Sequence, residues 1–251
     1  MDDHFDLGAY RAVLFDLDGV ITDTASLHAA AWKAMFDLFL AEQVQQRGVS
    51  LAPFSIDADY RRFVDGKPRY DGVRSFLESR GIDLPEGSSD DSPEMATVRG
   101  LGNRKNEIVV RLIEDEGVAT YPGSLALVRW LRGRSMPMAI VSSSANARAA
   151  LDSAGITELF DVIVDGVVAR QLKLPGKPAP DAFLLAAQRL GVPPSEAVVI
   201  EDALVGVAAG EAGGFGLVVG VDRLGQAAAL ASAGADVVVA DLAELLPGPS
   251  L

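Results

Sequence analysis

Six short apolar runs recur along the chain, and each is three or four residues long and rich in Val. Within each run the apolarity is continuous rather than alternating, which is typical of strands that are covered on both faces of a parallel sheet. The pattern therefore predicts six buried strands, at residues 12–15, 139–141, 162–164, 198–200, 217–219 and 237–239.

Helical patterns lie between the later runs. Apolar residues recur at helical spacing in residues 180–191, 204–213 and 224–234, and each of these stretches ends at Gly. Strands that alternate with helices indicate an α/β protein with a doubly wound, Rossmann-like parallel sheet.

Residues 25–118 interrupt this alternation. They carry helical patterns at residues 29–39, 61–64, 72–77 and 105–113, but no β-branched run of comparable quality. Residues 83–91 combine Pro, Gly, Ser and acids, which predicts a loop. We therefore expect two domains: an α/β core made of residues 1–24 and 119–251, and a helical domain made of residues 25–118. The sheet is expected to resume near residues 121–123.

Composition narrows the class of protein. The 251 residues are 49% hydrophobic and 23% charged, which is ordinary for a globular protein. A net charge of -13 argues against nucleic acid as a partner, and the lack of Cys excludes disulfides and thiolate metal sites. The acidic, polar first ten residues do not resemble a signal peptide, and no apolar run approaches membrane-spanning length. We expect a cytoplasmic protein with no membrane association.

Acidic residues follow two of the predicted strands directly. Asp16 and Asp18 come after the first strand, in Asp16-Leu17-Asp18-Gly19-Val20, and Glu201-Asp202 follows the strand at 198–200. Because the carboxyl ends of parallel strands meet at one edge of a sheet, we expect these carboxylates to lie together. Two carboxylates about 4 Å apart repel by roughly 4 kcal/mol at an effective dielectric near 20, so the group calls for a cation. Oxygen ligands alone suit Mg²⁺, which we expect as the cofactor.

Two further strand ends carry groups that can hold an anion. The strand at 139–141 leads into Ser142-Ser143-Ser144-Ala145-Asn146 and a predicted helix, whose start offers hydroxyl and N–H donors. Lys177 lies in Gly176-Lys177-Pro178-Ala179-Pro180-Asp181, where two prolines stiffen the loop. Simpler interpretations exist for all of these groups: polar turns, helix N-caps such as Asp202 before Leu204, and a solvated surface lysine.

Taken together, the four strand ends resemble those of the haloacid dehalogenase superfamily of phosphotransferases, and the match covers nearly the whole chain. A finer likeness, to the β-phosphoglucomutase-like branch, starts with residues 15–24, FDLDGVITDT, followed by His28 and Trp32. The resemblance implies that the helical domain is a cap inserted into the core. The other similar segments are Arg104-Lys105-Asn106, Tyr121-Pro122-Gly123, residues 142–146 and residues 176–181.

The resemblance implies a role for each matched residue of the core. Asp16 would be the nucleophile that forms an aspartyl phosphate, and Asp18 would be the general acid and base. The metal ligands would be Asp16, the main-chain carbonyl of Asp18, Asp202, and Glu201 either directly or through water. The groups holding the transferring phosphoryl would be Ser142, the N–H of Ser143, and Lys177.

A second phosphate site is also implied, because a mutase must hold a bisphosphate intermediate by its far end. Arg69 matches the cap arginine of the family, and its planar guanidinium can bond two phosphate oxygens. Taken alone, Arg69 could equally be a surface cation at a helix start, and a single His on a helix is more often structural. The other residues implied for the distal phosphate or the sugar are Lys67, Ser144, Asn146, Thr24, His28, Lys105 and Asn106.

The chain departs from the family pattern at Ala145, where a Lys is frequent. The substitution removes one cation near the distal phosphate, and Lys67 is a candidate replacement. The expected cap is also long at residues 42–57 and 83–99, where extra chain could change sugar selectivity or support dimerisation.

These observations predict an Mg²⁺-dependent phosphotransferase, and interconversion of β-D-glucose 1-phosphate and D-glucose 6-phosphate is the leading interpretation. A sugar-phosphate phosphatase, in which water resolves the same aspartyl phosphate, is the nearest alternative. A receiver-type signalling module is a third, but such a module gains nothing from an acid and base at Asp18 or from an inserted domain. The resemblance implies a sugar phosphate as partner, a functional link to a disaccharide phosphorylase, and a monomer or weak dimer.

Overall fold

The computed structural model describes residues 7–48 and 50–247, and it divides into two compact units. One unit comprises Met1–Asp23 and Val118–Leu251, and the other comprises Thr24–Gly117. Most of the acidic start considered above, residues 1–6, lies outside the described residues. None of the described helices is long and apolar enough to cross a membrane.

Within the described residues, the first unit is built on a six-stranded sheet whose neighbouring strands are all parallel. The six apolar runs all form strands, and the predicted α/β class with a doubly wound parallel sheet is confirmed. The strand order is β3-β2-β1-β4-β5-β6, with β1 Ala12–Phe15, β2 Met138–Val141, β3 Val162–Val164, β4 Ala197–Glu201, β5 Leu217–Val221 and β6 Val237–Val239.

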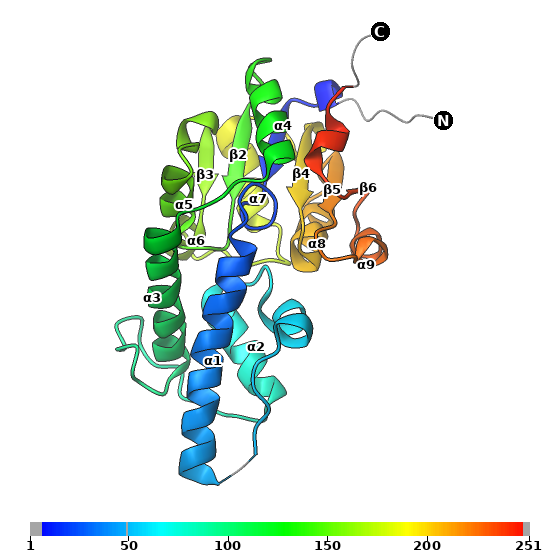
Figure 1. Cartoon of the computed structure of the whole chain (residues 1–251). Helices are drawn as coiled ribbons and strands as arrows, with labels where there is room; N and C mark the ends of the chain where they lie inside the picture. Colours follow the sequence, from blue (N-terminus) through cyan, green and yellow to red (C-terminus); the bar gives the residue numbers. More distant parts are fainter. Residues whose placement is uncertain (1–6, 49, 248–251) are drawn as a thin grey trace. The chain divides into compact units, whose positions relative to one another are not determined.

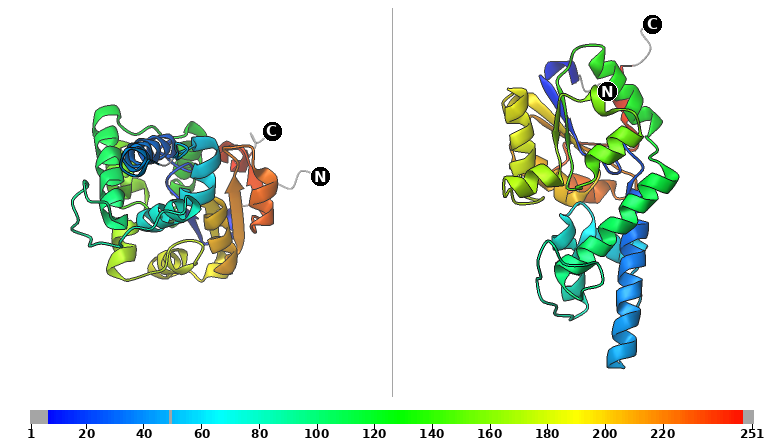
Figure 2. Two further views of the ribbon diagram at one scale, coloured as in Figure 1. Left: turned by 90° about the horizontal axis from the view of Figure 1, so that it is seen from below. Right: turned by 90° about the vertical axis from the view of Figure 1, so that its left-hand side faces the viewer.

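Helices cover both faces of the sheet (Figures 1 and 2). The side chains of β1 show how the two layers form, because Val13 and Phe15 enter one core while Ala12 and Leu14 enter the other. The first layer holds α4 (Pro122–Arg132), α5 (Ala147–Ser153) and the 3-10 helix η5 (Leu242–Leu245). The second layer holds α6 (Gly166–Gln171), α7 (Asp181–Leu190), α8 (Leu204–Ala212) and α9 (Ala227–Ser232). Short 3-10 turns complete the unit: η1 (Leu7–Ala9), η3 (Thr157–Leu159) and η4 (Pro194–Glu196).

The sheet resumes later than predicted. Residues 121–123 begin α4 rather than a strand, and β2 starts only at Met138. Pro122 lies in the first turn of α4, where its missing N–H costs nothing because that donor has no partner inside the helix. In the register of the sheet, Phe15 pairs with both Ile140 and Ile200, so β1, β2 and β4 end side by side.

The second unit is helical. It contains α1 (Ala25–Arg47), the π-helix η2 (Ile56–Val64), α2 (Arg69–Ser79) and α3 (Val98–Glu116). Its core is aromatic: the ring centroid of Phe36 lies 5.3 Å from those of Trp32 and Phe54, and 4.0 Å from that of Phe76. The predicted helical stretches fall inside these longer elements. Residues 69–71 of α2 and 99–104 of α3 are mostly polar or Gly, so the apolar repeat that predicts a helix begins only after them. Residues 83–91 form a loop, as predicted.

Candidate active site

The turn that follows β1 carries the first two acids. Asp16 is 7% exposed, and its N–H donates to the carbonyl of Ile200 at 2.9 Å, which ties the turn to β4. Gly19 has φ +85°, a conformation that side chains rarely adopt, and a Cβ there would lie 1.9 Å from Oδ2 of Asp202. Glycine is therefore required at this position for the second acidic loop to approach the first.

Lys177 occupies the centre of the sheet edge. Its side chain is 3% exposed, and Nζ lies 2.5 Å from Oδ1 of Asp16 and in ion-pair contact with Oε1 of Glu201. Nζ also donates to the carbonyl of Val141 at 3.3 Å. Because one buried ammonium contacts groups from β1, β2 and β4, Lys177 fixes the relative positions of three strand ends.

Glu201 is fully buried, and both of its oxygens are bound. Oε1 pairs with Lys177, while Oε2 accepts the N–H groups of Asp202 and Ala203, each at 3.0 Å. A Cβ on Gly206 of α8 would lie 1.9 Å from Oε1, so glycine is needed there to make room for the carboxylate. Glu201 thus holds both the lysine and the loop that carries Asp202. The residue at the N-cap of α8 is Ala203, so interpreting Asp202 as the N-cap is wrong.

The electrostatics of this edge favour a cation. Burial raises the pKa of Asp16 well above its ordinary value, and the carboxylates of Glu201 and Asp18 raise it further, against the opposing effect of Lys177. Burial alone would lower the pKa of Lys177, but the carboxylates of Asp16 and Glu201 outweigh burial and raise that pKa. A single ammonium therefore does not balance the negative charge collected here.

Three carboxylates are close enough to share an ion. One oxygen from each of Asp16, Glu201 and Asp202 lies within 4.8 Å of the others. Donors that are all carboxylate oxygens suit a hard divalent cation such as Mg²⁺ rather than zinc or copper. The residues therefore fit the metal that the sequence predicts.

The serines after β2 form a tight turn beside this cluster. The Ser142 hydroxyl is 3.4 Å from Oδ2 of Asp18, and it accepts the N–H of Ser144 at 3.0 Å. The Ser144 hydroxyl in turn accepts the N–H of Asn146 at 3.1 Å. These hydroxyls bond within the turn instead of capping α5, whose N-cap is Asn146, so the capping interpretation of the serines is wrong.

The helical unit holds a second polar group, formed between α1 and α3. Nζ of Lys105 lies 2.6 Å from Nδ1 of His28, and Lys105 is 5% exposed. An ammonium can only donate, so Nδ1 accepts and the ring hydrogen of a neutral His28 is on Nε2. The Lys105 ammonium also lies 5.0 Å from the centroid of Trp32, which is a core residue. Asn106 follows on α3, and the buried Thr24 precedes α1.

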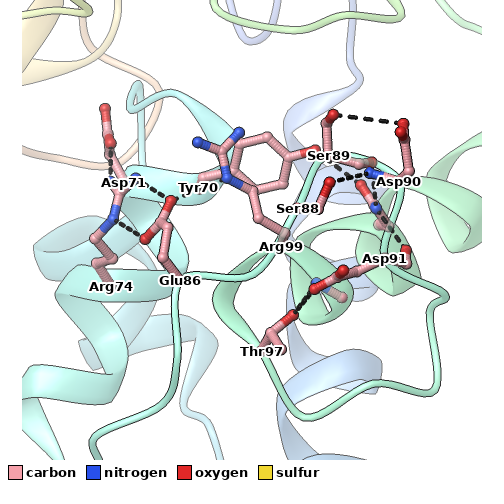
Figure 3. Close-up of polar contacts among 12 residues, drawn as sticks. Tyr70, Asp71, Arg74, Glu86, Ser88, Ser89, Asp90, Asp91, Thr97 and Arg99 are labelled. Atoms are coloured by element: carbon pink, nitrogen blue, oxygen red, sulfur yellow. Dashed lines mark hydrogen bonds and ion pairs between the residues drawn. The ribbon is translucent and has the colours of Figure 1, made fainter.

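Arg69 is the first residue of α2, and its side chain packs over the ring of Tyr70, with the guanidinium carbon 5.0 Å from the ring centroid. The Tyr70 hydroxyl donates to Oδ1 of Asn103 at 2.8 Å, and Arg99 lies over the same ring at 4.2 Å (Figure 3). A Cβ at Gly102 would lie 2.5 Å from Cδ1 of Tyr70, so this glycine lets the ring pack against α3. Lys67, just before α2, donates to Ser75 at 2.9 Å.

The loop between α2 and α3 is fastened to both helices, as Figure 3 shows. Glu86 accepts two bonds from Arg74, at 2.9 and 3.0 Å, and one from Arg99 at 2.9 Å. The bonds from Arg74, followed by those from Arg99, hold the pKa of Glu86 below its ordinary value. Nδ2 of Asn103 donates to the carbonyl of Asp91 at 2.9 Å. The predicted insertion therefore has a defined path beside the start of α2.

The predicted site residues fall into two groups, one in each unit. Sequence reasoning missed Arg223 and Gln226, which follow β5 at the same sheet edge and contact the acidic loops. The sequence carries little signal for Arg223, because it lies two residues after β5, stands in no motif and donates to main-chain carbonyls. The first unit contains Asp16, Asp18, Ser142, Ser143, Ser144, Asn146, Lys177, Glu201 and Asp202, and the second contains Thr24, His28, Lys67, Arg69, Lys105 and Asn106.

The parallel sheet and the acidic cluster at its carboxyl edge define the class of protein. The chain belongs to the haloacid dehalogenase-like hydrolase family, whose model matches residues 10–214. The resemblance seen in the sequence is confirmed, and the chain is an enzyme of this family.

Its similarity to β-phosphoglucomutases extends over almost its full length. The chain is 54% identical over 239 residues to a β-phosphoglucomutase of Mycobacterium bovis (strain ATCC BAA-935 / AF2122/97), covering 94% of this chain and 91% of the relative. It is 33% identical to a β-phosphoglucomutase of Bacillus subtilis (strain 168), over 94% of this chain and 91% of the relative. The crystal structure of a β-phosphoglucomutase from Clostridium difficile matches with a TM-score of 0.72 and 27% identity, covering 94% of this chain and 93% of that one. These similarities confirm the β-phosphoglucomutase-like branch.

Proposed function

We propose that this enzyme is a β-phosphoglucomutase that interconverts β-D-glucose 1-phosphate and D-glucose 6-phosphate through a 1,6-bisphosphate. The observation that carries the proposal is the buried cluster of Asp16, Lys177 and Glu201 beside Asp202, in a chain 54% identical to a protein of that name. The cluster combines a candidate nucleophile, a phosphate-binding cation and metal-binding oxygens at one sheet edge.

The proposed cofactor is Mg²⁺. Asp16, Asp202, the main-chain carbonyl of Asp18 and Glu201 are the groups proposed to hold it. When bound, Mg²⁺ supplies positive charge that offsets the repulsion between these carboxylates and an incoming phosphate. Glu201 is already engaged by Lys177 and by two N–H groups, so we propose that it contributes mainly by fixing its neighbours.

The proposed chemistry passes through Asp16. A carboxylate oxygen of Asp16 forms a bond to phosphorus while the bond from phosphorus to the sugar oxygen breaks, and Asp18 gives its proton to that oxygen. In the return step Asp18 takes the proton of the other sugar hydroxyl as that oxygen attacks the aspartyl phosphate. Lys177, the Ser142 hydroxyl and the N–H of Ser143 hold the phosphoryl oxygens through both steps.

We propose that the helical unit acts as a cap that holds the distal end of the bisphosphate. Arg69 is the main candidate for that phosphate, assisted by Lys67, Ser144 and Asn146, and the sugar would be contacted by Thr24, His28, Lys105 and Asn106. In His28 the Lys105 ammonium occupies Nδ1, so Nε2–H would be the donor to a sugar hydroxyl. Arg69→Ala should slow isomerisation at least tenfold more than it slows hydrolysis of a small phosphate ester, since only the mutase reaction needs a second phosphate site. Equal losses would contradict the assignment.

A sugar-phosphate phosphatase is the second candidate, and the family's description as hydrolases favours it. The two functions share the steps at Asp16 and differ in whether water or a sugar hydroxyl takes the phosphoryl group. Both are tested in one sample that contains Mg²⁺, β-D-glucose 1-phosphate and a trace of the 1,6-bisphosphate. We expect glucose 6-phosphate without matching release of inorganic phosphate. Phosphate release without glucose 6-phosphate would make the enzyme a phosphatase.

A further inference from the structure

The turn that carries Asp18 is held from outside by a side chain that none of the sequence motifs contains. Arg223 lies two residues after β5, and its side chain is 16% exposed. Its Nε donates to the carbonyl of Gly19 at 3.0 Å, one peptide after Asp18. Its Nη1 donates to the carbonyl of Ala240 at 3.1 Å, which anchors the guanidinium beyond β6.

The contacts of Arg223 are not those of a surface ion pair. Its nearest carboxylate contact is with Oδ2 of Asp241, at 3.5 Å, while Oδ1 of Asp241 accepts the N–H of Ala243. The guanidinium carbon lies 3.7 Å from the ring centroid of Tyr121, a close stacking contact. A guanidinium that packs against a ring and donates chiefly to main-chain oxygens restrains the backbone, because each bond fixes a carbonyl direction.

The same assembly binds the next two carbonyls of the turn. The buried Ser124 hydroxyl donates to the carbonyl of Val20 at 2.6 Å, and the N–H of Tyr121 donates to that of Ile21 at 3.0 Å. Nη2 of Arg223 lies 3.5 Å from the Ser124 hydroxyl. Three consecutive carbonyls, from Gly19 to Ile21, therefore point at donors from the start of α4 and from Arg223.

The second acidic loop is held from the same place. Gln226, at the N-cap of α9, donates from Nε2 to the carbonyl of Asp202 at 3.2 Å. Asp222 accepts the N–H of Gln226 at 2.7 Å, which fixes the backbone between the two contacting side chains. Residues 222–226, called here the β5–α9 loop, thus contact the backbone of both loops that carry the acids.

We propose that Arg223 and Gln226 are positioning residues, which set the spacing between the Asp18 turn and the Asp202 loop and so determine the affinity of the site for Mg²⁺. The inference rests on the metal site of the proposed function. It assigns to the β5–α9 loop a restraint on the main chain of both acidic loops, which adds to the contacts of Lys177 and Glu201 and opposes the repulsion between the carboxylates. The loop supplies the restraint from neutral and cationic donors outside the cluster.

The test is Mg²⁺ binding by isothermal titration calorimetry, without any sugar phosphate. Arg223→Met should weaken binding by about tenfold or more, since a hydrogen bond from a charged donor to the turn is lost. Arg223→Lys keeps the charge but offers one donor centre instead of the planar guanidinium fork. The Mg²⁺ affinity of this variant should therefore fall between that of the wild type and that of Arg223→Met. Gln226→Met should weaken binding by about fivefold, in keeping with the loss of a neutral hydrogen bond.

The matched control is Arg132→Met. Arg132 also pairs with a carboxylate, that of Asp161 at 2.7 Å, but it lies at the end of α4, near the opposite ends of the strands. This variant should bind Mg²⁺ as the wild type does. In turnover assays at saturating Mg²⁺, the Arg223 variants should still lose kcat, because the turn that carries Asp18 stays misplaced when the metal is bound. KM for the sugar phosphate should change by less than about twofold.

Mg²⁺ affinity and kcat within twofold of the wild type in Arg223→Lys and Gln226→Met would overturn the inference, even if the midpoint of thermal unfolding fell. These two conservative variants keep the test valid if Arg223→Met does not fold. The outcome is separable from the proposed function. A wild type that binds Mg²⁺ but forms no glucose 6-phosphate contradicts the mutase and leaves the inference standing, whereas a wild type that does not bind Mg²⁺ contradicts the metal site on which both rest.

Discussion

Replacing Lys177 by Met is the sharpest test of how the sheet edge is held together. The change removes the ammonium that pairs with Asp16 and Glu201 and keeps most of the apolar stem. Breaking a buried ion pair by deleting one partner typically costs about 3–5 kcal/mol, because the remaining charge stays buried without compensation. Here two carboxylates are left, so we expect a loss of at least about 3 kcal/mol in the free energy of unfolding, measured without Mg²⁺ at pH 7.5.

The loss should depend on pH, because protonation of Asp16 relieves it. Burial and the neighbouring carboxylates already raise the pKa of Asp16 in the folded protein, and without Lys177 that pKa rises further. A group whose folded pKa is raised stabilises the fold below its unfolded pKa, and this contribution is lost as pH rises through the folded value. The deficit of the Lys177→Met variant should therefore be smaller at pH 5 than at pH 7.5.

The assay is urea unfolding with EDTA, followed by the fluorescence of Trp130 in α4. A Trp32→Phe background removes the other of the two tryptophans, so that the signal reports only the unit that contains Lys177. Lys173→Met is the matched control, since it deletes an exposed lysine of the same segment and should change stability by less than about 0.5 kcal/mol. Saturating Mg²⁺ should restore part of the loss, by about 2.7 kcal/mol at one hundred times the dissociation constant. A loss below about 1 kcal/mol without Mg²⁺ would refute the buried pairing.

Two further predictions concern other parts of the molecule. Gly102→Ala places a methyl group 2.5 Å from the Tyr70 ring, so it should lower the stability of the helical unit by about 1–3 kcal/mol. Urea unfolding followed by Trp32 fluorescence in a Trp130→Phe background measures this loss. An unchanged stability would contradict the packing of the Tyr70 ring against α3. Burial acts to raise the pKa of Asp161, but hydrogen bonds from the N–H of Met138 and from Arg132 outweigh burial and hold that pKa below its ordinary value. Ionised Asp161 therefore stabilises the fold above its ordinary pKa, and this stabilisation is lost as pH falls through the lower pKa of the folded protein. Asp161→Asn should be less stable than the wild type at pH 6, and the difference in the free energy of unfolding should narrow below pH 3. Urea unfolding at several pH values checks this, and a difference that does not change with pH would count against it.

The sequence predicts the sheet well because its strands are buried on both faces. A continuous Val-rich run such as 198–200 is typical of a strand buried on both faces, and acids that directly follow such parallel strands gather at one edge of the sheet. The helical unit is less predictable. The start of α3 contains Gly100 and Gly102 and several polar residues, and its helical state depends on the Thr97 cap and on packing against Tyr70. The packing against Tyr70 is a tertiary contact and leaves no period in the sequence.

The β5–α9 loop marks the limit of sequence reasoning at the site. Arg223 and Gln226 stand in no motif, and their partners are main-chain carbonyls, which look alike at every position of a sequence. Glu201 shows a related limit. Its place directly after the predicted strand at 198–200 predicts a metal ligand, whereas the structure shows it paired with Lys177 and bound to two N–H groups, so that it holds its neighbours in place.

The most direct test of the account is to find the phosphoryl group on Asp16 during turnover. The enzyme would be mixed with Mg²⁺ and the 1,6-bisphosphate, quenched in acid within milliseconds, and digested for mass spectrometry. The account predicts one added phosphoryl group on the peptide that contains Asp16, and none in Asp16→Asn, which should fold normally and turn over no substrate. A phosphoryl group on another residue, or wild-type turnover by Asp16→Asn, would contradict the central claim.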